Sequence, residues 1–392
     1  MLELLFLLLP VAAGYGWYMG SRGFKNNQQQ NENRLSRNYV NGLDFLLSNQ
    51  KDKAFDLFLE MLKKEGSAFE AHLTLGNLFR SRGETDRAIR IHQSLMESAS
   101  LTFDQRLLAI QQLGRDYMAA GLYDRAERMF NELIEEKNFR VSSLQQLLTI
   151  YQAMSEWVNA IKVAQKLIKS GKEHQHLQKK VAHFYCELAL KAIAIDDISN
   201  AISLLKNAIS VNKHCARASI MLGRLYIDSN DFSKTVAVLQ KVLDQDKEVI
   251  SEALLMLDKC YKNLPKSTSD WMIFLNRCVN EGAGVVAELM MSDLIEQKEG
   301  LEAAQIYVNR QLQRHPNIHL FHRLMHYHLL DAEEGRAKES LLLLMNIVAE
   351  QIRTKPSYHC RQCGFKSHSF YWRCPSCRSW DSVKSIKGFD GH

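Results

Sequence analysis

Two pairs of cysteines near the end of the chain have the spacing of a metal site. Cys360 and Cys363 form one Cys-x-x-Cys pair, and Cys374 and Cys377 form a second pair after a gap of ten residues. Four thiolates brought together in this way make the tetrahedral sulfur shell that zinc or a single iron takes in proteins. Gly364 suits the positive φ that such a turn needs. We therefore predict one iron ion, with zinc as the alternative, bound by these four cysteines.

Two unconnected Cys-x-x-Cys pairs, or a thioredoxin-like redox site, are the alternatives to this interpretation. The surrounding segment, residues 355–392, is basic and rich in aromatic side chains. The basic residues can offset the negative charge of a thiolate-bound ion. A segment this short cannot bury a sufficient core alone, so metal and aromatic rings are expected to replace one. Nucleic acid stacking is the rival role for the rings. These are Tyr358, Phe365, Phe370, Tyr371, Trp372, Trp380 and Phe389.

The opposite end of the chain is predicted to cross a membrane. Residues 2–20 are apolar except for Glu3, and at helical rise this length spans about 29 Å, one hydrocarbon thickness. The positive-inside rule then places the N-terminus outside and the remainder in the cytoplasm. We expect a transmembrane helix over residues 1–20 and a juxtamembrane linker over residues 21–32. The basic residues that set this orientation are Arg22, Lys25, Arg34 and Arg37.

A cleaved signal peptide is the alternative for this segment, but no basic residue precedes its apolar run. Ala12, Gly16 and Gly20 recur every fourth residue. Such a stripe of small residues lets another transmembrane helix approach closely, although membrane helices are in any case rich in glycine and alanine. A reducing cytoplasm would also keep the cysteines available for metal.

Between these ends, residues 33–354 are predicted to form a helical repeat array. The pattern has a 34-residue period, with a small residue where the first helix crosses the second and an aromatic residue nearby, which is typical of tetratricopeptide repeats. We expect about nine repeats, with inserted loops near residues 98–103 and 171–180. Gly42, Phe45, Ala54 and Phe58 recur as Gly76, Phe79, Ala88 and His92, and later units repeat the pattern as Gly114 with Tyr117 and Gly223 with Tyr226.

Charge distribution indicates what this array binds. The net charge is +6, of which residues 1–25 contribute +1 and residues 355–392 contribute +5, so the array is neutral. A neutral superhelix is a poor platform for nucleic acid. Stacked repeats leave a concave groove that suits peptides and proteins. We therefore expect the array to bind protein and not nucleic acid.

The remaining candidates point to no catalytic site. Four further cysteines stand singly on repeat helices and are expected to be small core residues. A run of five histidines could place imidazoles on one helical face, but a second metal site is not favoured. No nucleotide-binding loop, nucleophile elbow or zinc-protease motif is found, so an enzyme is not expected. The cysteines are Cys186, Cys215, Cys260 and Cys278, and the histidines are His315, His319, His322, His326 and His328.

The chain combines an anchor beginning with the run Met1–Pro10, a tetratricopeptide array and a four-cysteine module. In this combination it resembles the lipopolysaccharide assembly protein B family of Gram-negative bacteria. The resemblance covers the whole chain and includes runs such as 71–83 and 110–117. It implies an all-α fold, a tetratricopeptide-repeat superhelical solenoid with an N-terminal transmembrane helix and a small C-terminal rubredoxin-like module over residues 355–392. The family's metal-binding cysteines map onto Cys360, Cys363, Cys374 and Cys377.

The same resemblance implies a non-enzymatic adaptor at the bacterial inner membrane, single-pass, with its N-terminus in the periplasm. Such an adaptor brings the lipid A deacetylase that commits lipid A synthesis to the membrane AAA+ metalloprotease for degradation. An inner-membrane lipopolysaccharide sensor protein is expected to oppose it at or near the anchor. The oligomeric state is left open, with a homodimer as one option.

A membrane-tethered electron carrier with a rubredoxin-type iron is the second hypothesis. A carrier needs a reversible iron couple and a redox partner, whereas an adaptor needs only the fold that the metal enforces. Arg378 follows the second cysteine pair where rubredoxins have glycine, and the gap between the pairs is shorter than theirs. These departures put redox function in doubt but leave metal binding intact.

Overall fold

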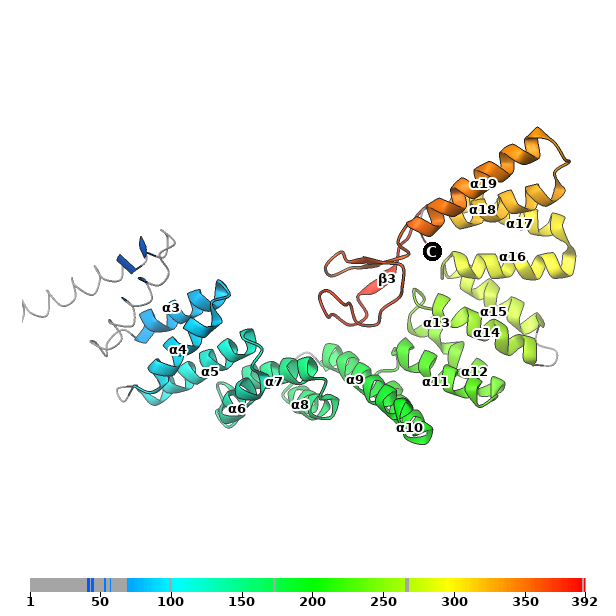
Figure 1. Ribbon diagram of the computed structural model, residues 1–392. Coiled ribbons are helices and arrows are strands. Elements are labelled where there is room, and N and C mark those ends of the chain that lie inside the picture. Colours follow the sequence, from blue (N-terminus) through cyan, green and yellow to red (C-terminus); the bar gives the residue numbers. More distant parts are fainter. Residues whose placement is uncertain are drawn as a thin grey trace, which may run out of the picture. The chain divides into compact units, whose positions relative to one another are not determined.

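The computed structural model describes residues 69–98, 101–171, 174–264, 268–389 and 391, together with positions 41, 42, 44, 45, 53 and 57. The predicted membrane segment and linker, residues 1–32, lie outside the described residues, as does most of the first predicted repeat. Within the described ranges no helix combines the length and apolar character that a membrane span requires. Helices followed by a small sheet make up these ranges, which divide after Met154 into two units (Figure 1).

Antiparallel helical hairpins build the first unit, in which α3 packs against α4 and α5 against α6. A capping box starts α5: the Thr102 hydroxyl accepts from the Gln105 N–H, and the Gln105 side chain accepts from the Thr102 N–H. This arrangement satisfies two N–H groups that a helix start leaves without partners. The helices are α3 (Phe69–Ser81), α4 (Thr85–Met96), α5 (Phe103–Ala119), α6 (Tyr123–Leu133) and α7 (Arg140–Met154).

Glycine residues mark the points at which the two helices of a hairpin cross. A Cβ atom on Gly114 of α5 would lie 2.9 Å from the ring of Phe130 on α6, closer than real contacts allow. The absence of a side chain therefore lets the helices approach and bury the aromatic ring completely. This confirms the small residue predicted at the crossing. The same pairing recurs for Gly76 with His92 and for Gly223 with Leu239.

The second unit continues the hairpins, with α9 against α10, α11 against α12, α16 against α17 and α18 against α19. Its helices are α8 (Trp157–Lys169), α9 (His174–Ala194), α10 (Ile198–Val211), α11 (Ala216–Asp228), α12 (Phe232–Leu239), α13 (Lys241–Gln245), α14 (Ser251–Asn263), α15 (Thr268–Asn280), α16 (Val285–Glu299), α17 (Leu301–Arg314), α18 (Ile318–Asp331) and α19 (Arg336–Thr354).

One of the two predicted insertions takes a different form. Before Phe103, α4 ends at Met96, and the described residues 97, 98, 101 and 102 are not helical, as the predicted loop requires. The insertion predicted over residues 171–180 is mostly helical, because α9 already begins at His174. From His174 onward the stretch contains no glycine or proline, and Leu177 and Val181 are buried, so the extra residues lengthen a helix. The prediction of a loop there was wrong.

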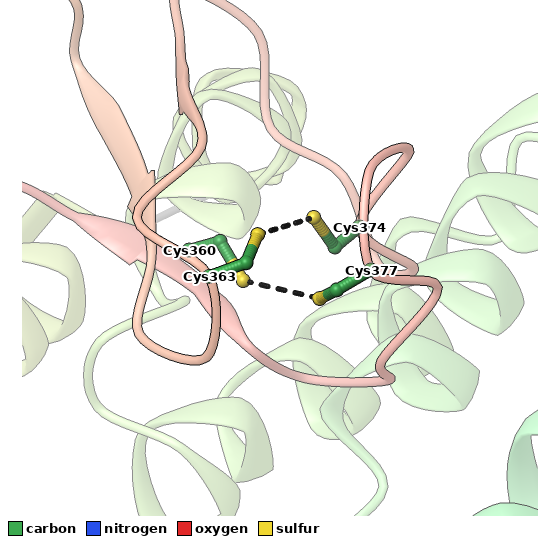
Figure 2. A group of neighbouring side chains, drawn as sticks. All are labelled: Cys360, Cys363, Cys374 and Cys377. Carbon is green, nitrogen blue, oxygen red and sulfur yellow. Dashed lines mark hydrogen bonds between the residues drawn. The ribbon is translucent and has the colours of Figure 1, made fainter. Parts of the chain in front are cut away.

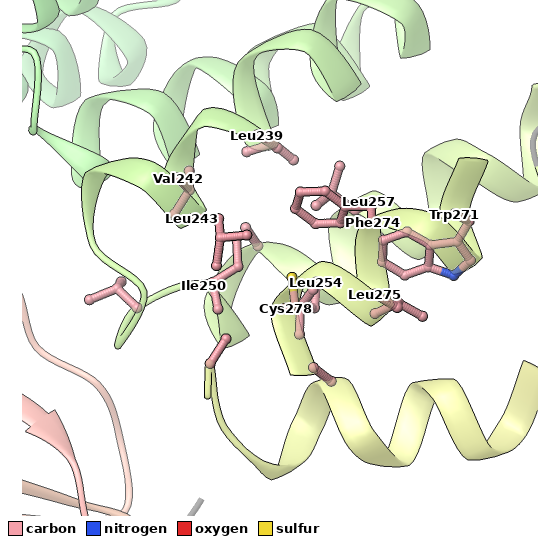
Figure 3. Close-up of a cluster of buried hydrophobic side chains, with 14 of the residues drawn as sticks. Leu239, Val242, Leu243, Ile250, Leu254, Leu257, Trp271, Phe274, Leu275 and Cys278 are labelled. Atoms are coloured by element: carbon pink, nitrogen blue, oxygen red, sulfur yellow. The ribbon is translucent and has the colours of Figure 1, made fainter. Parts of the chain in front are cut away.

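A large hydrophobic cluster in the second unit is shared by helices α11 to α16 (Figure 3). Trp271 is 2% exposed and stacks on Tyr261 with ring centroids 4.9 Å apart. Phe370 and Trp372, from the region of the metal site, pack against this cluster. The repeats therefore cover these two aromatic rings of the short C-terminal segment, while Tyr371 and Phe389 stay exposed.

The C-terminal module carries a three-stranded antiparallel sheet with the order β2-β1-β3. Its strands are β1 (Tyr358–Cys360), β2 (Lys366–Ser367) and β3 (Val383–Ser385). Cys360, at the end of the central strand, lies opposite Val383. Both residues are 1% exposed and form a small core of their own. The sheet thus fixes the first cysteine pair against the last strand.

Candidate metal centre

Each cysteine pair lies in a tight turn with the same backbone hydrogen bonds. The Cys360 carbonyl accepts from the Gly364 N–H at 2.8 Å, and the Cys374 carbonyl accepts from the Arg378 N–H at 2.9 Å. In both turns the N–H of the first cysteine also donates to the carbonyl five positions further on, at 2.7 and 2.9 Å respectively. Two equivalent turns therefore present their thiols toward one point.

The four sulfur atoms fit a single tetrahedral ion. They all lie within 4.8 Å of one another, and the Sγ atoms of Cys360 and Cys377, and of Cys363 and Cys374, are 3.7 Å apart (Figure 2). Metal–sulfur bonds of about 2.3 Å in a tetrahedron place neighbouring sulfur atoms about 3.8 Å apart. The chain thus carries a four-cysteine metal site. Thiolates in this geometry suit both iron and zinc.

The four thiols differ in burial and acidity. Cys360 and Cys374 are buried, Cys377 is half-buried and Cys363 is exposed. Burial raises the pKa of Cys360. Hydrogen bonds from the Ser382 hydroxyl and from the N–H groups of the turn have the larger opposite effect and bring the pKa down to about 6. Burial raises the pKa of Cys374 to about 11. Hydrogen bonds to a thiolate favour the form that binds metal, so Cys360 is prepared as a ligand.

Positive φ occurs at the same place in both turns. Gly364 has a φ of +76°, as predicted, and Arg378 has a φ of +58°. An L-residue with a side chain pays about 1–2 kcal/mol for this conformation. The sequence showed Arg378 only as a departure from the rubredoxin pattern. The structure shows that the second turn keeps the left-handed conformation without glycine.

Trp380 anchors the module to the repeats. Its ring stacks on His183 of α9, with centroids 4.8 Å apart and an interplanar angle of 9°, and meets Trp157 of α8 edge-on at 6.3 Å. The guanidinium groups of Arg217 on α11 and of Arg373 lie 5.4 and 5.3 Å from the ring centroid. Such cation–π contacts gain strength when they are shielded from water. Trp380 therefore connects the module with three repeat helices.

A hydrogen bond next to Trp380 adds a polar contact. The His183 ring, only 2% exposed, lies 2.7 Å from a carboxylate oxygen of Asp381 through its Nε2 atom. Burial raises the pKa of Asp381. The hydrogen bond and the electrostatic interaction with His183 have the larger opposite effect, so the pKa lies below its ordinary value. Arg217 also pairs with Glu187 at 2.8 Å. Arg217 therefore has a carboxylate partner at this contact.

A second contact joins the module to the start of α14. The Tyr358 hydroxyl donates to Glu252 at 2.7 Å. Glu248 forms ion pairs with Arg361 at 2.8 Å and with Lys387 at 2.7 Å. Burial raises the pKa of Glu248, but the two cations have the larger effect and lower it. Lys384 pairs in addition with Asp246. Much of the module's positive charge is thus used to hold it against acidic repeat residues.

The last described residues of the chain form a third contact. The Ile318 N–H at the start of α18 donates to the Phe389 carbonyl at 2.8 Å, and the Asn317 side chain donates to the Gly391 carbonyl at 2.7 Å. The module is therefore held at three places along the second unit. None of the contacting repeat residues belongs to the tetratricopeptide signature, and no sequence motif marks them.

The other candidate residues do not form a site in the described chain. Cys186, Cys215, Cys260 and Cys278 are buried, as expected of core residues. The first two hydrogen-bond to each other within the repeat core. Among the residues that the structure describes, only the four module cysteines bring three or more ligand atoms together. The histidines of α17 and α18 do not converge.

Comparisons with known proteins agree with this architecture. The rubredoxin metal binding domain matches residues 358–385, and the tetratricopeptide repeat matches residues 71–106 and 192–260. Lipopolysaccharide assembly protein B of Escherichia coli strain K12 is 61% identical over 391 residues and covers all of both chains. The protein of that name from Haemophilus influenzae is 45% identical over 394 residues, which is 98% of each chain.

Among solved structures, a crystal structure of MamA protein aligns with 47% of this chain and 95% of its own, at 20% identity and a TM-score of 0.32. We draw nothing from so low a score. The family matches confirm the predicted helical repeat array and its C-terminal four-cysteine module. The predicted bounds of the domains and the number of repeats stay predictions.

Proposed function

The chain belongs to the lipopolysaccharide assembly protein B family, and on that premise we propose that it is a non-enzymatic adaptor of the bacterial inner membrane that regulates lipopolysaccharide biosynthesis. In this proposal it presents the committed-step lipid A deacetylase to the membrane AAA+ metalloprotease. Residues 1–20 tether it, with the N-terminus in the periplasm and the repeats in the cytoplasm. An inner-membrane lipopolysaccharide sensor protein opposes it through contacts at or near this anchor.

The observation that carries this proposal is that the metal module is built into the repeat array. Its aromatic side chains and backbone carbonyls contact α8, α9, α11, α14 and α18. A bound ion held by the four cysteines would cross-link two turns and so enforce the module's fold. The metal then shapes part of a protein-binding surface, which is what an adaptor requires.

An electron carrier is the second candidate, and the exposure of Cys363 favours it. Electron transfer needs a site that a redox partner can approach, and Cys363 is the exposed residue among the four cysteines. The two candidates differ in what they require of the metal. Only the carrier needs an ion that changes its redox state.

Exchange of the metal separates the candidates. Zinc and cadmium accept four tetrahedral thiolates but do not cycle between redox states under cellular conditions. We expect the zinc-loaded and cadmium-loaded proteins to lower deacetylase levels as well as the iron-loaded protein does, measured in a reconstituted degradation assay with membrane protease. Iron-loaded protein is the control. A folded, zinc-loaded protein without activity would reject the adaptor and favour the carrier.

Removal of the anchor tests the membrane part of the proposal. A tether raises the effective concentration of client and protease at the bilayer, often a hundredfold or more over free diffusion. We expect deletion of residues 1–20 to leave a folded, metal-loaded protein under which cellular deacetylase rises several-fold, measured by immunoblot at matched expression.

Replacing residues 1–20 with an unrelated membrane helix is the matched control. Rescue would show that the segment is only a tether, and failure would assign a specific contact to the stripe of Ala12, Gly16 and Gly20. Normal deacetylase levels with the anchorless protein would show that membrane attachment is not part of the mechanism.

A further inference from the structure

A cavity of about 410 Å³ lies where the end of the module meets the repeats. Its walls come from the start of α14, the α15–α16 and α17–α18 connections, the first turn of α16 and the stretch after β3. The volume falls in the range of ligand-binding sites. The apolar part of the wall consists of Val279, Ala283, Val285, Val286 and Pro316.

The charged groups at this cavity favour an anion. Arg314 and His315 line it as exposed residues, and within the described residues neither side chain makes a hydrogen bond or ion pair. The N-terminus of α16, a helix of 15 residues, opens onto it at Gly284, where no side chain caps the helix. Uncapped N–H groups and the helix dipole attract negative charge. Lys387, also in the wall, is already paired with Glu248.

Two polar side chains in the wall lack partners. Ser385 is only 9% exposed, yet its hydroxyl makes no side-chain hydrogen bond within the described chain, and it lines the cavity. Glu288 also lines it without a hydrogen-bonding partner, and burial raises the pKa of its carboxyl although nearby His315 lowers it. A polar side chain as buried as Ser385 normally has a hydrogen-bonding partner, whereas Glu288 is only half-buried. A ligand with both donors and acceptors would supply one.

The same corner of the array already binds peptide backbone. Asn317, which also lines the cavity, donates to the Gly391 carbonyl at 2.7 Å, and the next N–H along α18 donates to the Phe389 carbonyl at 2.8 Å. These donors therefore hydrogen-bond the carbonyl groups of the chain's own last described residues, which run across the ends of the repeat helices. A peptide is therefore the class of ligand that fits both the corner and the repeats.

We propose that this cavity binds the C-terminal carboxylate of a partner protein, with an apolar last side chain against Val285 and Pro316. The inference rests on the adaptor function proposed above and names how a partner is held. The carboxylate would lie near Arg314, His315 and the start of α16, and the preceding peptide N–H groups would reach Glu288 and Ser385. Helix termini and basic side chains recognise chain-terminal carboxylates in this way.

The acidic residues argue against a phosphate ligand. Glu248 and Glu288 both line the cavity, and their charges would repel a dianion more strongly than a single carboxylate. A free organic acid shares the carboxylate chemistry but lacks the peptide donors. The test therefore has to distinguish a chain terminus from a small acid.

The probe is a fluorescein-labelled hexapeptide pool, randomised at five positions and ending in valine with a free carboxylate. It is titrated by fluorescence anisotropy against the metal-loaded full chain in lipid nanodiscs. We expect the free-acid pool to bind and the same pool with an amidated terminus to bind at least about tenfold more weakly, since a lost charged hydrogen bond costs this much. Arg314→Ala should weaken binding of the acid pool to the same extent.

Arg310→Ala is the matched control, because Arg310 is one helical turn earlier, exposed and outside the cavity wall. It should bind like the unaltered protein. Equal binding of acid and amide pools, or unchanged binding by Arg314→Ala, would overturn the proposal. If isovalerate at equal concentration displaced the peptide pool, the ligand of the cavity would be a small organic acid and not a protein terminus, and the proposal would be wrong. Binding is measured without protease or deacetylase, so failure here would leave the adaptor function itself standing.

Discussion

Replacement of Cys360 and Cys363 together by serine is expected to release the metal and unfold the module. The binding free energy of a four-thiolate ion, on the order of 10 kcal/mol or more, is largely the folding free energy of such a small domain. The sheet cannot compensate, because its strands are two or three residues long. Elemental analysis of the purified full chain should show metal falling from one equivalent to nearly none.

The repeats should survive this change, since each hairpin is stabilised by its neighbours. Far-UV circular dichroism should therefore keep nearly all of its helical signal. Loss of the module would uncover His183 and Trp157, and hydrogen exchange should increase along α8 and α9. Cys260→Ser is the control, because this buried cysteine lies on α14 outside the sulfur cluster and should leave metal content unchanged. One equivalent of metal in the double variant would show that the four-thiolate assignment is wrong.

The features that the sequence could predict are those with a local or periodic origin. A spacing of two residues within each cysteine pair dictates a turn, and the turn points both thiols one way. Glycine recurs at the crossings of three described hairpins because each needs the same close approach, as Gly114 and Phe130 show. Both patterns repeat a geometric constraint, so they are visible without knowledge of the tertiary structure.

The docking of the module has no such pattern. Asp381 and His183 are 198 positions apart in the chain, and Tyr358 and Glu252 are 106 apart. The repeat signature specifies residues between helices, whereas these residues face away from that core and occur once each. The helical start of α9 was missed for a related reason, because a change in repeat spacing does not reveal whether extra residues form a loop or a helix.

Trp380→Ala is the variant that should separate docking from metal binding. The ring is not a metal ligand, and it makes the stacking contacts with His183 and Trp157. Truncating a core tryptophan costs about 3–5 kcal/mol, and because Trp380 is half-buried we expect a loss of about 3 kcal/mol. That corresponds to roughly a hundredfold weaker docking. The metal content should stay at one equivalent.

Limited proteolysis and hydrogen exchange of the full chain measure this effect. The junction between α19 and the module should be cleaved faster, and amides of α9 and α11 should exchange faster, in the variant. Tyr371→Ala is the matched control, because Tyr371 is an aromatic residue of the same module that is 41% exposed. It should behave like the unaltered protein. Unchanged exchange in Trp380→Ala would show that the remaining ion pairs hold the module without the ring.

The Trp380→Ala variant and the double cysteine variant together distinguish the two roles of the metal. If the metal acts by shaping a surface shared with the repeats, Trp380→Ala should lose most of the effect on deacetylase levels while it keeps its ion. If the metal acted through electron transfer alone, a module that retains its ion should remain active after undocking. The docked interface, built from residues that lie far from the sulfur atoms in the sequence, is therefore where the two functional hypotheses make opposite predictions.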